Sequence, residues 1–485
     1  MNLSIICYFI GYVLRIEGVL MLLPAIVGAA YGEKQCYAFF AVAALTFLIG
    51  FALTFKRDKN QAFYAKEGFV AVALSWIALS LFGCLPFIFS GDIPRFADAF
   101  FETVSGFTTT GSSILSDVEA LSQCSLLWRS FSHWIGGMGV LVFLLMILPT
   151  AGGSAMHLLK AESPGPQVGK TVPKLRESAR ILYIIYTVMT VVEIVILLCG
   201  GMPLFDAVTL SFGTAGTGGF AIKSTGLAEY SAFSQYVIAA FMILFGVNFN
   251  VYYLILIRKV KQAAKSEEVW WYFSAIALAV LTITLNTRQL FVNMEESFRS
   301  ALFHVGSIIT TTGYATYDFN NFPQLSKTIL LGLMFMGACA GSTGGGIKVS
   351  RIIILLKSAR DELARIVHPR AVRRVRLDGK PIEAETFRSV HAYMMAYIAL
   401  FVVSMLLISV DDFDMTTNFS AVTAAINNIG PGFNVVGPMG SFGGFSDVSK
   451  YVFCFDMLAG RLELFPMLVL INPGTWRRAL RRGRK

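Results

Sequence analysis

Four short segments that contain glycine and small polar residues interrupt the apolar sequence of this chain. Two contain Thr-Thr-Thr-Gly, at residues 108–111 and 310–313, and two looser copies span residues 214–220 and 427–432. Inside a lipid bilayer, irregular backbone is tolerated only where it lines a water-filled cavity or is buried in protein. We therefore expect the four segments to meet around one axis and to offer their backbone carbonyls to a dehydrated cation.

The residue types of these segments suit an ion that has lost its water. Carbonyl oxygens can replace that water only if successive peptides turn the same way, which requires backbone conformations that glycine tolerates. Threonine adds an uncharged hydroxyl oxygen, and a short helix that ends at the segment presents its negative C-terminus to the cation. The alternative is that glycine and threonine only pack transmembrane helices closely. That alternative does not readily explain four segments that each follow a short helix.

The predicted filter consists of three residues in each segment. These are Thr109, Thr110, Gly111, Thr217, Gly218, Gly219, Thr311, Thr312, Gly313, Asn428, Ile429 and Gly430. In the first and fourth segments a phenylalanine lies eleven residues before the glycine, and the same count from Phe205 ends at Gly216. Aligning Gly219-Phe220 with Gly313-Tyr314 instead selects Gly218 or Gly219. We favour Thr217-Gly218-Gly219 and keep Gly216 as the alternative.

A second glycine-rich stretch, residues 337–348, interrupts a long apolar run. Five glycines in ten residues do not form a stable straight helix. We predict a loop within the membrane, beneath the filter, that acts as a gate, and a tightly packed kink is the alternative. Phosphate binding is excluded, because this stretch lacks the glycine–lysine spacing of a phosphate-binding loop and Pro164 replaces the glycine that residues 165–171 would need.

Arg461 lies within the last apolar run, where a charge at bilayer depth costs roughly 2.5–3.5 kcal/mol on insertion scales. It must therefore face the protein interior or a cavity. It is either an electrostatic barrier in the pore or the ion-pair partner of Glu463 or Glu193, and both interpretations stay open. Lys348 either acts similarly or extends to the cytoplasmic edge. The predicted gate residues are Gly337, Gly341, Ser342, Thr343, Gly344, Gly345, Gly346, Lys348 and Arg461.

Long apolar helices must hold these segments in place. A transmembrane helix needs roughly 20 mostly apolar residues, and such runs form a unit of outer helix, short re-entrant helix, filter segment and second helix that repeats four times. The outer helices are expected at 68–90, 180–200, 269–291 and 390–410, the short helices at 96–107, 204–213, 296–308 and 416–427, and the second helices at 125–149, 232–257, 327–357 and 450–471. Two helices at 4–30 and 38–55 precede the repeats, have no filter segment and are interpreted as an appendage.

The composition agrees with this organisation. Of the 485 residues, 55% are hydrophobic and only 14% are charged, which differs strongly from a soluble domain. We predict an all-α polytopic membrane protein with four repeats around a pseudo-fourfold pore. Its predicted parts are an N-terminal helix pair (1–60), pore repeats at 68–152, 178–262 and 268–358, the last with the gate loop 337–346, a cytoplasmic linker (359–388), and a fourth pore repeat with a basic C-terminal tail (389–485).

The basic residues indicate the topology. Thirty of the 40 Lys and Arg residues lie in five segments, at 56–67, 150–180, 258–268, 348–391 and 476–485. The positive-inside rule places these segments, and with them both termini, in the cytoplasm. No basic patch with interleaved aromatic residues suggests nucleic-acid binding. The seven cysteines are isolated, so neither disulfides nor a zinc site is expected, and no nucleophile–base pair suggests an enzyme.

The chain resembles the TrkH/TrkG/KtrB superfamily of potassium transport proteins over essentially its full length, and most closely the TrkH branch. The matching motifs are FTTTG at 107–111, HWIGGMG at 133–139, AGSTGGGIK at 340–348, NNIGPG at 427–432 and GRLE at 460–463. The resemblance implies a homodimer with one pore in each protomer, which passes K+ and Rb+ in preference to Na+. It also implies a TrkA-like cytoplasmic ring that binds NAD, ATP or ADP and gates the pore, with Arg461 beneath the filter.

The resulting hypothesis is gated potassium uptake across a plasma membrane, most simply the bacterial inner membrane. Potassium is then the bound ion, membrane lipid surrounds the protein, and no organic cofactor is expected on the chain. The alternative is a Na+- or H+-coupled secondary cation transporter, whose site would lie at broken helices near the membrane midplane. Four units of the same orientation suit a pore better than two inverted halves, and ionisable residues for proton coupling are scarce within the spans.

Overall fold

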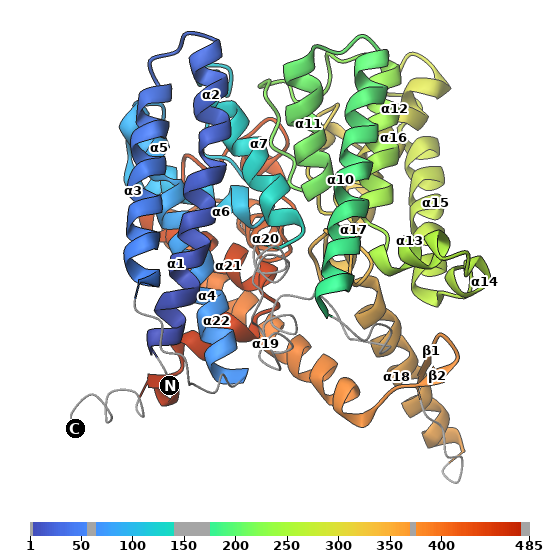
Figure 1. Ribbon diagram of the computed structural model, residues 1–485. Coiled ribbons are helices and arrows are strands. Elements are labelled where there is room, and N and C mark those ends of the chain that lie inside the picture. Colours follow the sequence, from blue (N-terminus) through green and yellow to red (C-terminus); the bar gives the residue numbers. More distant parts are fainter. Residues whose placement is uncertain (1–2, 56–64, 140–174, 369–374, 477–485) are drawn as a thin grey trace.

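The computed structural model of the chain describes residues 3–55, 65–139, 175–368 and 375–476. Most of this part is helical, strands are almost absent from it, and many of the longer helices stand side by side (Figure 1). Within the described ranges, six helices are long and apolar enough to cross a membrane, and one bent helix pair adds a seventh crossing if it forms one span. The predicted all-α polytopic fold is therefore confirmed.

Three N-terminal helices pack together on one side of the molecule (Figure 1), α1 (Leu3–Leu20), α2 (Leu22–Ala30) and α3 (Cys36–Thr54). The single helix predicted at 4–30 is interrupted at Met21. The cause is Pro24, which has no backbone N–H to donate and whose ring crowds the Leu20 carbonyl. Helices α1 and α3 approach closely, since a Cβ at Gly11 would lie only 2.8 Å from the Gly50 carbonyl oxygen.

Four repeats follow, each with an outer helix, a short pore helix and a second helix. Repeat 1 contains α4 (Ala65–Gly83), α5 (Leu85–Ser90), α6 (Phe96–Phe107) and α7 (Gln123–Gly137). Repeat 2 contains α10 (Leu175–Cys199), α11 (Leu204–Gly216), α12 (Ala232–Phe245), α13 (Phe249–Leu256) and α14 (Val260–Ala263). Repeat 3 contains α15 (Glu267–Thr287), α16 (Met294–Ile309), the 3-10 turn η1 (Phe319–Asn321), α17 (Gln324–Met336) and α18 (Val349–Val367). Repeat 4 contains α19 (Ala384–Ile408), η2 (Ser409–Asp411), α20 (Met415–Ile426), η3 (Asn434–Val436), α21 (Asp447–Arg461) and α22 (Phe465–Ile471). The pore helices are α6, α11, α16 and α20.

The pore helices are buried in the protein, so the hydroxyl groups of their serine and threonine side chains need hydrogen-bond partners within it. Thr108 Oγ1 donates to the Val104 carbonyl at 2.7 Å, and Thr310 Oγ1 donates to the Gly306 carbonyl at 2.7 Å. These bonds to the preceding helical turn satisfy the hydroxyl groups where neither water nor lipid does so. The helices can therefore bring polar residues to their C-terminal ends at membrane depth.

The second helix is interrupted in repeats 2, 3 and 4. Helices α12 and α13 meet at 89°, residues 337–348 separate α17 from α18, and α21 ends at Arg461 before α22 begins at Phe465. The sequence predicts only the interruption in repeat 3, so the continuous helices predicted at 232–257 and 450–471 are wrong. In repeat 4, Glu463 and Leu464 have φ of 61° and 64°, a left-handed conformation that no α-helix contains.

The linker predicted at 359–388 is shorter than expected, because α18 continues to Val367 and α19 begins at Ala384. Between them, β1 (Arg376–Leu377) and β2 (Lys380–Pro381) form an antiparallel hairpin. Lys357 of α18 donates to the Arg376 carbonyl at 2.8 Å and pairs with Glu267 of α15 at 2.5 Å, which ties the hairpin to repeat 3. The predicted cluster at 56–59, the end of the predicted helix 125–149, the basic loop up to residue 174 and the tail from residue 477 lie outside the described residues.

Candidate cation filter and gate

The four predicted filter loops touch one another in chain order and close a ring. The glycine of each loop makes this contact, because a Cβ added there would overlap a carbonyl oxygen of the next loop. A Cβ on Gly111 would lie 1.9 Å from the Gly218 carbonyl oxygen, and one on Gly219 would lie 1.8 Å from that of Thr312. A Cβ on Gly313 would lie 2.1 Å from the Ile429 carbonyl oxygen, and one on Gly430 would lie 2.8 Å from that of Thr110. Only glycine permits this approach. Because the fourth loop returns to the first, all the predicted filter residues lie together.

The four loops also share one backbone pattern. The first residue of each, which is Thr109, Thr217, Thr311 or Asn428, has φ between 54° and 61°, and the glycine two residues later has φ between 78° and 101°. The residue between them has no positive φ, and this alternation turns successive carbonyls toward the same side. Thr217-Gly218-Gly219 therefore has the same register as the other three loops, whereas Gly216 is the last residue of α11.

Each pore helix ends immediately before its filter loop, and the closing hydrogen bonds are the same in all four repeats. The N–H of the middle loop residue donates to the carbonyl five residues earlier, at 2.8 to 2.9 Å. The pairs are Thr110 with Ser105, Gly218 with Gly213, Thr312 with Ser307 and Ile429 with Ala424. Helices commonly end in this way through a left-handed residue. The negative ends of four helices therefore converge on the ring, which favours a cation there.

The ring presents neutral oxygen atoms. Thr109 Oγ1 and Asn428 Oδ1 are buried without a hydrogen-bond partner among the described residues. The hydroxyls of Thr110 and Thr312 are instead engaged at 2.8 and 2.7 Å by the threonines two residues earlier. Carbonyl and hydroxyl oxygens are the ligands that replace the hydration shell of an alkali cation. The geometry therefore suits a monovalent cation as cargo.

The loop between α17 and α18 packs directly against the ends of pore helices α16 and α20. Gly345 N–H donates to Thr311 Oγ1 at 2.6 Å, and Gly346 N–H donates to the Asn427 carbonyl at 3.0 Å. A Cβ at Gly344 would lie 2.8 Å from the Thr310 carbonyl oxygen. The loop therefore touches two of the filter loops.

The same loop also fills the interruption between α12 and α13 of repeat 2. Cys339 N–H donates to the Gly246 carbonyl at 3.0 Å, and Phe249 N–H donates to the Gly341 carbonyl at 3.0 Å. Ser342 Oγ donates back to the Cys339 carbonyl at 2.6 Å. The free backbone groups of one interrupted helix are therefore satisfied by the loop of the neighbouring repeat.

Arg461, the last residue of α21 in repeat 4, contacts the loop between α17 and α18. Its guanidinium donates to the Thr343 carbonyl at 2.8 Å and to the carbonyls of Gly136 and Gly137 at 2.5 and 2.7 Å. Arg461 thus joins the loop to the C-terminal end of α7 in repeat 1. A cation at this place contacts the negative end of a helix, which is favourable.

Two other predicted features near the loop involve buried charges. Lys348 is only 1% exposed and its ammonium donates to the Gly344 carbonyl within the loop, so of the two interpretations of Lys348 the extension to the cytoplasmic edge does not hold. Glu463, one of the two partners considered for Arg461, pairs with Arg351 of α18. The Arg351 guanidinium also lies 3.9 Å from the centre of the Tyr393 ring. The charges around the gate loop are therefore held by specific contacts.

Glu268 is a residue of this site that the sequence analysis misses. It lies near the start of α15, is 5% exposed, and accepts hydrogen bonds from Ala340 N–H at 2.7 Å and Ser350 N–H at 3.0 Å. Ala340 lies within the glycine-rich stretch and Ser350 lies in the first turn of α18, so one carboxylate ties the loop to the helix that follows it. A single carboxylate at the start of a helix forms no spacing pattern, and residue 268 falls in a basic segment predicted to be cytoplasmic, so no signal in the sequence marks it.

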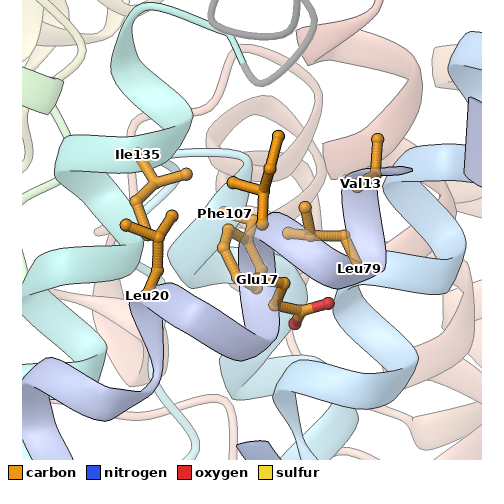
Figure 2. Close-up of a pocket in the computed structure, with 7 residues that line it drawn as sticks. Val13, Glu17, Leu20, Leu79, Phe107 and Ile135 are labelled. Atoms are coloured by element: carbon orange, nitrogen blue, oxygen red, sulfur yellow. The ribbon is translucent and has the colours of Figure 1, made fainter. Parts of the chain in front are cut away.

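The N-terminal helices are more than an appendage, because α1 packs behind the first pore helix. Figure 2 shows Glu17 of α1 at a small cavity that Leu79, Phe107 and Ile135 also line. Phe107 is the last residue of α6, and a Cβ at Gly83 would lie 2.7 Å from its ring. The first filter loop is therefore supported from behind by α1 and α4.

Known proteins resemble this chain along nearly its whole length. The TrkH family, described as a cation transport protein, matches residues 35–269 and 263–474. The Trk system potassium uptake protein TrkH of Salmonella typhimurium is 35% identical over 98% of this chain and 100% of its own length. The Trk system potassium uptake protein TrkG of Escherichia coli is 32% identical over 98% of this chain and 99% of its own. The crystal structure of the potassium transporter TrkH from Vibrio parahaemolyticus has a TM-score of 0.88 and 32% identity, covering 98% of this chain and 100% of that one.

Proposed function

This chain belongs to the TrkH family of cation transport proteins, and on that premise we propose that it takes up potassium through a gated, K+-selective pore. The observation that supports this most is the closed ring of four filter loops, in which each glycine contacts a carbonyl of the next loop. Potassium and rubidium would shed their water onto this ring, where neutral carbonyls of fixed number and spacing favour them over the smaller sodium ion. The predicted filter residues then act through their backbone oxygens.

The gate in this proposal is the loop 337–348 together with Arg461. In the described conformation the loop is bonded to Thr311 of the filter and to Arg461. Cation passage then requires the loop to leave these contacts, and the positive charge of Arg461 adds an electrostatic barrier beside it. The loop is held by hydrogen bonds to the filter, to the interruption between α12 and α13, to Glu268 and to Arg461. Each contributes about 0.5–3 kcal/mol, so opening requires several of these bonds to break.

Tracer rubidium uptake into proteoliposomes that contain the purified protein tests the proposal. We expect uptake that external K+ blocks and that Na+ or Li+ blocks only weakly, with protein-free liposomes as the control. Uptake that instead requires a Na+ or H+ gradient would contradict the pore. That result would favour the alternative, a Na+- or H+-coupled secondary cation transporter.

The proposal extends to the assembly. We propose a homodimer in the bacterial inner membrane, surrounded by lipid, with both termini in the cytoplasm and a TrkA-like ring that binds NAD, ATP or ADP and controls the pore. The concentration of basic residues in a few segments supports this orientation. Helix α18, the β1–β2 hairpin and the first part of α19 lie together at one end of the molecule (Figure 1). Because α18 begins at Val349, directly after the gate loop, a partner bound there is in a position to move the gate.

Arg461→Gln is expected to raise the rate of rubidium uptake several-fold. The change removes a positive charge and the bonds that tie the loop to repeats 1 and 4, and each hydrogen bond from a charged group contributes about 1.5–3 kcal/mol. Arg365→Gln is the matched control, since Arg365 lies exposed on α18 and pairs with Glu362. Initial uptake rates at equal protein density measure the effect. A rate for Arg461→Gln at or below that of the wild type would contradict the gating role.

A further inference from the structure

The middle residue of the second filter loop differs from those of the other three. Repeats 1 and 3 have threonine at this position, repeat 4 has isoleucine and repeat 2 has Gly218. The place that a side chain of Gly218 would occupy is already filled. A Cβ at Gly218 would lie 2.2 Å from Cγ and 2.3 Å from Nδ1 of His133, which belongs to α7 of repeat 1. The imidazole ring of one repeat thus takes the place of the missing side chain in the next.

His133 is also hydrogen-bonded to both repeats. Its Nε2 accepts from Phe220 N–H at 3.2 Å, and its Nδ1 lies 2.8 Å from the Gly106 carbonyl oxygen. Because Nε2 is an acceptor, the neutral ring has its proton on Nδ1 and donates it to Gly106. His133 therefore joins the last turn of pore helix α6 to the residue that directly follows Gly219. A protonated ring could not accept from Phe220, so the neutral tautomer is part of the geometry.

Arg129 supports the same residue from one helical turn earlier on α7. Its guanidinium lies 4.1 Å from the centre of the Phe220 ring, and Nη1 donates to the Ala221 carbonyl at 3.3 Å. Arg129 also forms an ion pair at 2.7 Å with Glu102 of α6, and both side chains are almost fully buried. Residues four apart lie on one helix face. The face of α7 that contains Arg129 and His133 therefore contacts both the ring and the backbone N–H of Phe220.

The second loop needs this support more than the others do. Its adjacent glycines, Gly218 and Gly219, have the greatest backbone freedom of any residue pair. In repeats 1 and 3 the middle threonine is fixed within its own loop by the hydroxyl bonds of Thr110 and Thr312. Gly218 has no side chain to do this, yet its carbonyl is the one that touches Gly111 across the ring. A shift of Gly218 would therefore displace an oxygen of the filter.

We propose that His133 is a positioning residue of the filter that sets ion selectivity by standing in for the side chain that Gly218 lacks. The inference rests on the proposed function of the ring as a K+ filter. It concerns which ions pass and not whether the pore opens, since His133 acts on a carbonyl of the filter. It follows that substitutions at positions 133 and 218 have coupled effects on ion selectivity.

Three variants test the coupling by tracer rubidium uptake with competing K+ or Na+. His133→Ala, which removes the ring, is expected to lower the preference for K+ over Na+ by about tenfold, corresponding to about 1.4 kcal/mol. Gly218→Thr is expected to lower it at least as much, because the new side chain overlaps the imidazole. The double variant His133→Ala/Gly218→Thr is expected to recover part of the preference, since the threonine then has the vacated space and a double-mutant cycle isolates the coupling.

His304→Ala is the matched control. His304 is a buried histidine of pore helix α16 whose nitrogens lie 2.7 and 2.9 Å from the carbonyl oxygens of Ser300 and Tyr317, both in its own repeat. This variant is expected to keep the wild-type K+ preference even if less folded protein is recovered. If His133→Ala does not give a monodisperse protein, His133→Gln, which keeps much of the side-chain volume, serves in the same comparison.

Three results would overturn the inference. They are a wild-type K+ preference in the His133 variants, a double variant no more selective than Gly218→Thr, and an equal loss of preference in His304→Ala. In each of these cases the wild-type protein is still K+-selective, so only the role of His133 would be rejected and the proposed function would stand. A wild-type protein without K+ preference would instead remove the proposed function itself.

Discussion

Gly111→Ser and Gly313→Ser are each expected to lower the preference of the pore for K+ over Na+ by about tenfold or more. Both glycines have φ in the left-handed region, at 81° and 86°, where a side chain adds about 1–3 kcal/mol of strain. A Cβ there would also lie about 2 Å from a carbonyl oxygen of the adjacent loop, at 1.9 Å and 2.1 Å respectively. The carbonyl must move away, so the ring loses the spacing that fits potassium.

Gly91→Ser separates the two causes. Gly91 follows α5 and has φ of 83°, close to that of Gly111, but nothing lies within 4 Å of a Cβ added there. This variant carries the same backbone strain without a displaced carbonyl, and its K+ preference is expected to equal that of the wild type. Rubidium uptake with competing K+ or Na+ measures all three variants. Unchanged selectivity in both Gly111→Ser and Gly313→Ser would remove these loops from the filter.

Deletion of residues 338–345 is expected to raise the rate of rubidium uptake by about tenfold, which corresponds to about 1.4 kcal/mol. The deleted segment includes Gly345, whose N–H binds Thr311 of the filter. The ends that remain are already neighbours, because a Cβ at Gly337 would lie 2.9 Å from the Cα of Gly346. Consecutive Cα atoms are about 3.8 Å apart, so α17 and α18 can be joined with little displacement.

The ratio of K+ to Na+ competition is the internal control for the deletion. If only the gate is removed, the faster uptake keeps the wild-type ratio, since the filter loops are intact. Faster uptake with no ion preference would show that the filter itself had collapsed. A deletion variant that is no faster than the wild type would rule out the loop as the gate.

Several parts of this protein are decided by local properties of the sequence, and for that reason they are predictable from it. The length of each apolar run determines whether a helix can cross a membrane, and the repeats follow from the order of these runs. The short helices predicted at 96–107 and 416–427 agree within one residue with α6 and α20. The last residue of each filter loop has φ between 78° and 101°, a range that glycine tolerates, so these glycines are visible in the sequence.

The interruptions in repeats 2 and 4 depend on the tertiary structure. An interrupted helix leaves backbone N–H and carbonyl groups unpaired inside the membrane, which is tolerated only if other parts of the protein bind them. The Gly246 carbonyl binds Cys339 of repeat 3, and Arg461, at the interruption in repeat 4, binds the carbonyls of Gly136 and Gly137 in repeat 1. These partners are far away in the chain. Asn248 caps α13 and Pro466 lies in the first turn of α22, but these local signals do not identify the partners that the interruptions require.

The sequence by itself determined the membrane class, the order of the four repeats and the candidate residues of three of the four filter loops, because apolar length and glycine geometry act over a few residues. Only the tertiary structure decided the register of the second filter loop, which glycine meets which carbonyl, that Glu268 binds both the gate loop and the first turn of α18, and that His133 fills the space beside Gly218. Those contacts result from the packing of helices from different repeats, and side-chain periodicity contains no information about a partner that distant.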